Sequence, residues 1–118
     1  MQPKDKRVIE KIIHRIKLIL QYCEGIDYDQ FNRTSMISEA CVFNLLQIGE
    51  MCNRDLSDTL KEKYDHVPWR QIYGLRNRIV HGYDDVQLNI IWETIQEVKC
   101  RIFPSTKNSA VKVQSFRQ

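Results

Sequence analysis

The chain has 118 residues, of which 18 are basic and 15 acidic, giving a formal net charge of +3, and 42% are hydrophobic. This length leaves room for one domain with one core and excludes two. The small net charge is not that of a protein that coats nucleic acid, so any RNA contact needs a local basic patch. No apolar run is long enough to span a bilayer, and the first residues are charged rather than signal-like, so we expect a cytoplasmic protein.

Apolar residues at three- and four-residue steps predict a long helix from Pro3 to Glu24. Pro3 suits its first turn and Gly25 its end. Segment 25–35 is polar and predicts the turn of a helical hairpin, with one short helical turn near 28–31. A second long helix is predicted from 36 to about 54.

Two neighbouring residues inside the second helix have opposite expected environments. Gly49 costs about 1 kcal/mol relative to alanine in a helix, so we expect it to allow another helix backbone to approach closely. Glu50 is expected to be a solvated surface carboxylate rather than part of a polar cleft.

The second half of the chain predicts three further helical segments. A short helix over 56–64 has Ser57 as its expected N-cap, and a helix that restarts at Pro68 has a core stripe of Trp69, Ile72, Leu75 and Ile79. The last helix follows Asp85, a fair N-cap, and ends at Pro104. The predicted fold is an all-α, up-and-down bundle of four to five helices over residues 1–104, followed by a basic, mobile tail over 105–118.

The cysteine and histidine spacings do not indicate a metal site. Cys23, Cys41, Cys52 and Cys100 form no close pair in sequence, so free thiols that fill core space are expected. His14, His66 and His81 are far apart, and His14 lies off the apolar stripe. We therefore expect no metal and no cofactor.

Residues 76–83, Arg-Asn-Arg-Ile-Val-His-Gly-Tyr, combine a guanidinium, an amide, an imidazole and a phenol. Arginine presents a rigid fork of donors to phosphate oxygens, and an imidazole can take and return a proton near neutral pH. These groups suit the cleavage or formation of a phosphodiester. The alternative is structural: Arg76 as a surface charge, His81 at a helix C-terminus and Tyr83 anchored on the core.

The helical spacing limits how these residues meet. Arg76 and His81 are five positions apart and point about 140° away from each other. Asn77 lies four positions before His81, so its amide could orient the imidazole. Either the helix loosens at Gly82 or a second copy of the chain completes the site. We favour the second, a homodimer whose two-fold axis brings two Arg/His pairs into one cleft.

The chain resembles the HepT-like ribonuclease toxins of the HEPN superfamily over about residues 4–103. The resemblance rests on the signature Arg-x4-His-x-Tyr with Pro-Trp upstream and Trp92 downstream. The stretches that carry it are 44–50, 67–72, 74–83 and 86–96.

The resemblance implies an all-α fold and a metal-independent RNase that acts as a homodimer on an RNA substrate. It maps Arg76 and His81 onto the catalytic pair, with Asn77 in support. It also implies a toxin–antitoxin pair, in which an MntA-like nucleotidyltransferase antitoxin transfers AMP to Tyr83 and silences the toxin. Two alternatives stay open: a non-catalytic helical module that binds a nucleotidyltransferase or a nucleotide, and a purely structural bundle.

Overall fold

The computed structural model describes residues 2–82 and 86–102, and these form helices without strands. Four helices are long and two are short: α1 (Pro3–Tyr22), α2 (Tyr28–Arg33), α3 (Ser35–Arg54), α4 (Asp58–Lys63), α5 (Trp69–His81) and α6 (Leu88–Ile102). The all-α bundle is confirmed. The short turn expected near 28–31 is a complete helix because Asp27 and Gln30 cap it reciprocally, each side chain accepting from the other's backbone N–H.

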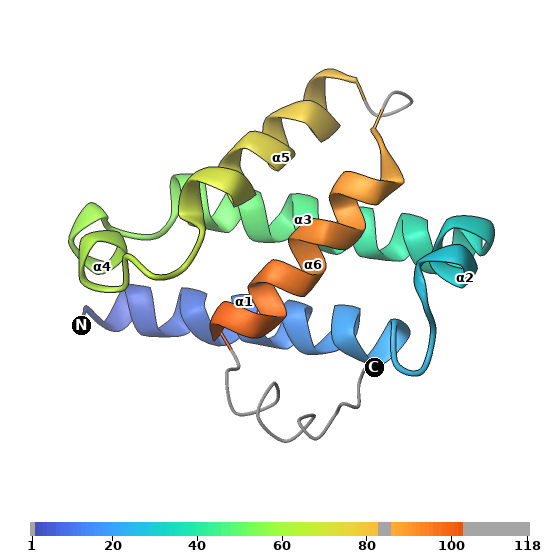
Figure 1. The fold of residues 1–118 in the computed structure, drawn as a ribbon. Coiled ribbons are helices and arrows are strands. Elements are labelled where there is room, and N and C mark those ends of the chain that lie inside the picture. Colours follow the sequence, from blue (N-terminus) through green and yellow to red (C-terminus); the bar gives the residue numbers. More distant parts are fainter. Residues whose placement is uncertain (1, 83–85, 103–118) are drawn as a thin grey trace.

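The two longest helices run antiparallel and form the base of the molecule (Figure 1). Helix α5 packs on α3, while α6 crosses the bundle obliquely and contacts α1, α2 and α5. The short helices α2 and α4 lie at opposite ends of α3 (Figure 1). No described helix is both long and apolar enough to span a membrane.

The core is built from the predicted apolar stripes. Ile91 and Phe31 are 0% exposed, and Trp92 packs against the Phe31 ring with the centroids 5.0 Å apart. The core residues of the four long helices are Val8, Ile12, Ile16, Ile19, Cys41, Val42, Leu45, Ile48, Cys52, Ile72, Leu75, Ile79, Ile91, Ile95 and Val98. The short helix α2 therefore joins the core through Phe31 and contacts the first half of α6.

A buried carboxylate joins the first turn of α1 to the start of α4. Asp5 is 3% exposed, and its two oxygens accept hydrogen bonds from the backbone N–H and the hydroxyl of Ser57, at 3.0 and 2.7 Å. These bonds, the hydroxyl's first, hold the pKa of Asp5 below its ordinary value. Ser57 Oγ also accepts from the backbone N–H of Leu60, which confirms Ser57 as an N-cap.

One expectation from the sequence needs correction, and two others concern residues that the structure does not describe. Cys41 and Cys52 are buried and Cys23 is half-buried, but Cys100 is exposed, so the expectation that all four cysteines fill the core is wrong for Cys100. Asp85, the expected N-cap of the last helix, and the tail over 105–118 lie outside the described residues.

Candidate functional site

Helix α5 carries most of the candidate site residues and is fixed to the bundle by its inner face. Of the predicted stripe, Ile72, Leu75 and Ile79 are buried at helical spacing, and Trp69 is partly buried against the core. At the start of the helix, the Trp69 indole N–H donates to the backbone oxygen of Tyr64 at 2.9 Å. The orientation of α5 therefore determines where its outer side chains point.

Gly49 sets the distance between α3 and α5. A Cβ placed at Gly49 would lie 2.6 Å from the Cβ of Arg76 and 3.5 Å from the backbone oxygen of Ile72. No side chain fits in this space, so the expected close approach at Gly49 is confirmed, and the approaching helix is α5. The contact places residue 50 of α3 beside Arg76.

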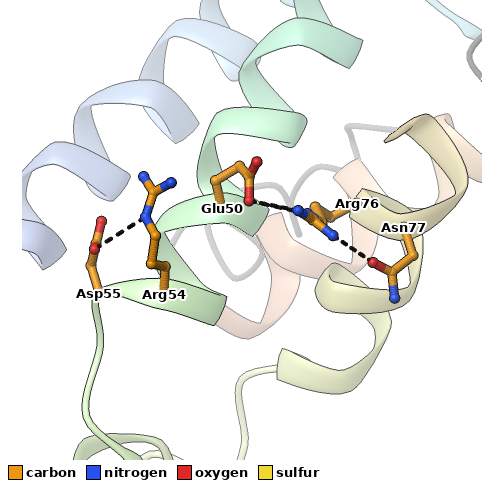
Figure 2. A network of polar contacts seen from close by, with 5 residues as sticks. All are labelled: Glu50, Arg54, Asp55, Arg76 and Asn77. Carbon is orange, nitrogen blue, oxygen red and sulfur yellow. Dashed lines mark hydrogen bonds and ion pairs between the residues drawn. The ribbon is translucent and has the colours of Figure 1, made fainter. Parts of the chain in front are cut away.

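The Arg76 guanidinium is held on two sides (Figure 2). Its Nε donates to Oε1 of Glu50 at 3.1 Å, and its Nη2 lies 3.0 Å from the same oxygen. Its Nη1 donates to the Asn77 amide oxygen at 2.8 Å. A guanidinium has five N–H donors, so two remain after these three contacts.

The ion pair between Arg76 and Glu50 orients the guanidinium more than it stabilises the fold. The side chains of Arg76 and Glu50 are 21% and 28% exposed. Ion pairs that water reaches contribute about 0.2–1 kcal/mol, a small part of the stability of a domain. The expectation that Glu50 is a solvated surface carboxylate is wrong, because the helix crossing brings the carboxylate to Arg76.

Asn77 contacts Arg76 rather than His81. Its amide oxygen is the acceptor for Arg76 Nη1, so the idea that this amide orients the imidazole finds no support in the described contacts. Asn77 remains a supporting residue of the candidate site, through the guanidinium.

His81 is exposed and is the last residue of α5. It lines a groove of about 520 Å³ between α5 and the start of α6, together with Leu75, Arg78, Gly82, Val86, Gln87 and Ile90. Helix α5 is regular through His81 and ends at Gly82. The helix is therefore not unwound before His81 in a way that would turn the imidazole toward Arg76. One chain therefore leaves Arg76 and His81 on different sides of α5. Tyr83 lies outside the described residues.

The outer face of α5 between these two residues is partly apolar and uncovered. Tyr73 and Val80 are 42% and 46% exposed. At about 100° per residue around the helix axis, Arg76 lies about 60° to one side of Tyr73, and His81 lies about 80° to the other side. On the neighbouring helix α3, Phe43 is 53% exposed. The Arg15 guanidinium of α1 lies over the Phe43 ring, 5.6 Å from its centroid. We call Tyr73 and Val80 the outer face.

The matching family model is Ribonuclease HepT-like, and it covers residues 12–103. The chain belongs to this family. Three relatives fit the assignment. A Caldanaerobacter subterraneus subsp. tengcongensis protein named "Putative RNase" is 33% identical over 74% of this chain and 77% of its own. A Methanocaldococcus jannaschii protein of the same name is 29% identical over 78% and 84%.

The third relative is the "Probable ribonuclease HepT" of Thermococcus cleftensis, which is 26% identical over 82% of this HepT-like chain and 87% of its own. No solved structure matches the chain. The resemblance drawn from the signature around Arg76 is thus confirmed at the level of the family. Among the residues described, no group of three or more His, Cys, Asp and Glu side chains is arranged to hold a metal ion.

Two glycines test the helix crossing as a matched pair. In Gly49→Ala the new methyl group would overlap Arg76 Cβ, so we expect a loss of about 1–3 kcal/mol in the free energy of unfolding. In Gly74→Ala nothing lies within 4 Å of the new Cβ, so the better helix former should add about 0.5–1 kcal/mol. Urea unfolding measures both, and equal stability of the two variants would contradict the close crossing.

Proposed function

We propose that this HepT-like protein is a metal-independent endoribonuclease and the toxin of a toxin–antitoxin pair, with Arg76 and His81 as its catalytic residues. The observation that carries the proposal is the fixed guanidinium of Arg76. Glu50 and Asn77 orient it, and two N–H donors stay available at the edge of an exposed face. Such a group suits the oxygens of a phosphodiester. The names of its relatives give RNA as the polymer.

The proposed reaction is attack by the RNA 2′-hydroxyl on the neighbouring phosphorus. His81 takes the proton from this hydroxyl or delivers one to the leaving 5′-oxygen. Arg76 stabilises the charge that develops on the oxygens bound to phosphorus, and the fixed position of its guanidinium avoids reorganisation during the reaction. The products are a 2′,3′-cyclic phosphate and a 5′-hydroxyl.

The site is proposed to form between two copies of the chain. Within one chain Arg76 and His81 point apart, so a single chain does not present both to one phosphate. The outer face between them carries exposed side chains, and a second copy that covers Tyr73 and Val80 would be bordered by both catalytic side chains. A homodimer therefore accounts both for the exposed apolar residues and for the divergence of the two catalytic groups.

The proposed regulation is AMP transfer to Tyr83 by an MntA-like nucleotidyltransferase antitoxin. Tyr83 follows His81 by two residues. An added AMP brings a negative phosphate and a bulky base close to the position where the RNA phosphate must bind. Charge repulsion and volume are then sufficient for inhibition, and no conformational change is required.

The catalytic assignment is tested with purified protein and a mixed-sequence RNA in excess EDTA. We expect the wild type to cleave and Arg76→Ala and His81→Ala to lose at least about 100-fold in rate, the scale of a missing acid–base or charge-stabilising group. Arg70→Ala and His14→Ala remove exposed side chains of the same types and should cleave normally. Equal cleavage by all four variants contradicts the assignment. A wild type that binds a nucleotidyltransferase and cleaves no RNA supports the non-catalytic module instead.

The dimer is tested by placing a charge on the outer face. Tyr73→Asp should be monomeric in sedimentation velocity experiments and should lose cleavage in parallel, because a buried unpaired carboxylate opposes association. Met36→Asp is the control, since Met36 is 84% exposed and lies away from α5 near the start of α3. A monomeric Tyr73→Asp variant that cleaves at the wild-type rate would show that the dimer is not needed.

The modification is tested by incubating the protein with the nucleotidyltransferase and ATP. Mass spectrometry should find AMP on the peptide that contains Tyr83, and the modified protein should no longer cleave RNA. Tyr83→Phe should prevent the addition, whereas Tyr73→Phe should not. The proposal is wrong if the Tyr83→Phe variant still gains AMP or if the modified wild type keeps its activity.

A further inference from the structure

Two thiols that lie far apart in the sequence are in contact in the fold. The sulfur atoms of Cys23 and Cys41 are 3.7 Å apart and share a hydrogen bond. Cys23 is the residue at which α1 ends, and Cys41 lies in the second turn of α3. The cysteine spacing gave no sign of this pair, because the antiparallel packing of α1 and α3 creates it.

The two thiols differ in their access to solvent. Cys41 is 0% exposed. Cys23 is half-buried and lines a groove of about 810 Å³, whose charged lining residues are Glu24, Asp27 and Lys99. A small reagent therefore reaches Cys23 first and meets Cys41 only behind it.

The surroundings also favour ionisation of the accessible thiol. The hydrogen bond from Cys41, together with the charge of Lys99, lowers the pKa of Cys23 against the opposing effect of burial. The same bond, with burial, raises the pKa of Cys41. Burial, against the opposing charge of Lys61, raises the pKa of Cys52 to about 12. A thiolate is the reactive form of cysteine, so Cys23 is the nucleophile of the pair.

We propose that Cys23 is a peroxide-reactive modification site and that Cys41 resolves it into an intramolecular disulfide. In the first step the Cys23 thiolate attacks one oxygen of hydrogen peroxide. An S–O bond forms, the O–O bond breaks, and hydroxide leaves and takes up a proton. Cys23 is then a sulfenic acid, oxidised by two electrons.

In the second step the Cys41 sulfur attacks the sulfenic sulfur. The S–S bond forms, the S–O bond breaks, and the oxygen leaves as water with the thiol proton of Cys41. Overall, two thiols lose two electrons and two protons, and one peroxide becomes two waters. The sulfurs must approach from 3.7 Å to about 2.05 Å. Cys23 can supply this movement because it follows the last helical residue of α1.

The bond would connect α1 to α3 and enclose α2 between its two ends. Helix α2 contacts α6 through Phe31 and Trp92, so the disulfide would restrain the part of the core that surrounds these two rings. A disulfide that closes the loop between Cys23 and Cys41 would stabilise the fold mainly by restricting the unfolded chain. Oxidation should therefore raise the midpoint of thermal unfolding by several degrees, and dithiothreitol should reverse the change.

The experiment treats the full-length reduced protein with hydrogen peroxide, blocks the remaining thiols, and maps the peptides by mass spectrometry without reduction. We expect a peptide pair joined through Cys23 and Cys41, lighter by two hydrogens. Iodoacetamide should modify Cys23 at least about tenfold faster than Cys52, because Cys52 is 3% exposed and burial raises the pKa of its thiol. Because these measurements use the wild type, no variant has to fold for the result to count.

Variants then separate the two steps. In Cys41→Ser the sulfenic acid on Cys23 should persist and react with dimedone, whereas Cys100→Ser should form the disulfide as the wild type does. The proposal is overturned if peroxide oxidises the exposed Cys100 while Cys23 and Cys41 stay reduced. It is also overturned if the dimedone adduct on Cys23 is equally abundant with and without Cys41.

Discussion

The close crossing of α3 and α5 at Gly49 is the constraint on which the candidate site depends. With hydrogen in place of a side chain at this position, the backbone of α3 comes near the Cβ of Arg76. The crossing brings the Glu50 carboxylate within hydrogen-bonding distance of the guanidinium. A larger residue would separate the helices and leave Arg76 free to sample many rotamers. The glycine therefore converts a flexible surface arginine into a fixed donor.

The contact with Glu50 that fixes the guanidinium also weakens its attraction for a phosphate. Glu50 places a negative charge beside the cation that is proposed to bind a phosphate, so part of the attraction for the substrate is cancelled before RNA arrives. Catalysis benefits more from donors held in the right place than from net charge, because donors that are already oriented need no rearrangement as charge develops. In the proposed mechanism Glu50 is thus a positioning residue, which would act on the reaction through Arg76.

The sequence was sufficient to predict the helices but not their side-chain partners. Helical periodicity depends on local spacing alone, so the four long helices, the Ser57 cap and the close approach at Gly49 were all predictable. The partners of Glu50 and Asn77 depend on the angle at which α3 and α5 cross, which no local pattern contains. Two other contacts were missed for the same reason. They are the bond between Asp5 and Ser57, which are 52 positions apart, and the contact between Cys23 and Cys41. The exposure of Cys100 follows from its place outside the apolar stripe of α6, a signal that the sequence did contain.

In the proposed dimer, Arg76 from one chain and His81 from the other serve the same phosphate. The most direct test co-expresses Arg76→Ala and His81→Ala chains with two different tags and purifies the mixed dimer on both. Each variant alone should be inactive. A mixed dimer retains one intact pairing of Arg76 with His81 and should recover about half of the wild-type rate per dimer. An inactive mixed dimer would show that both residues act from the same chain and would contradict the account.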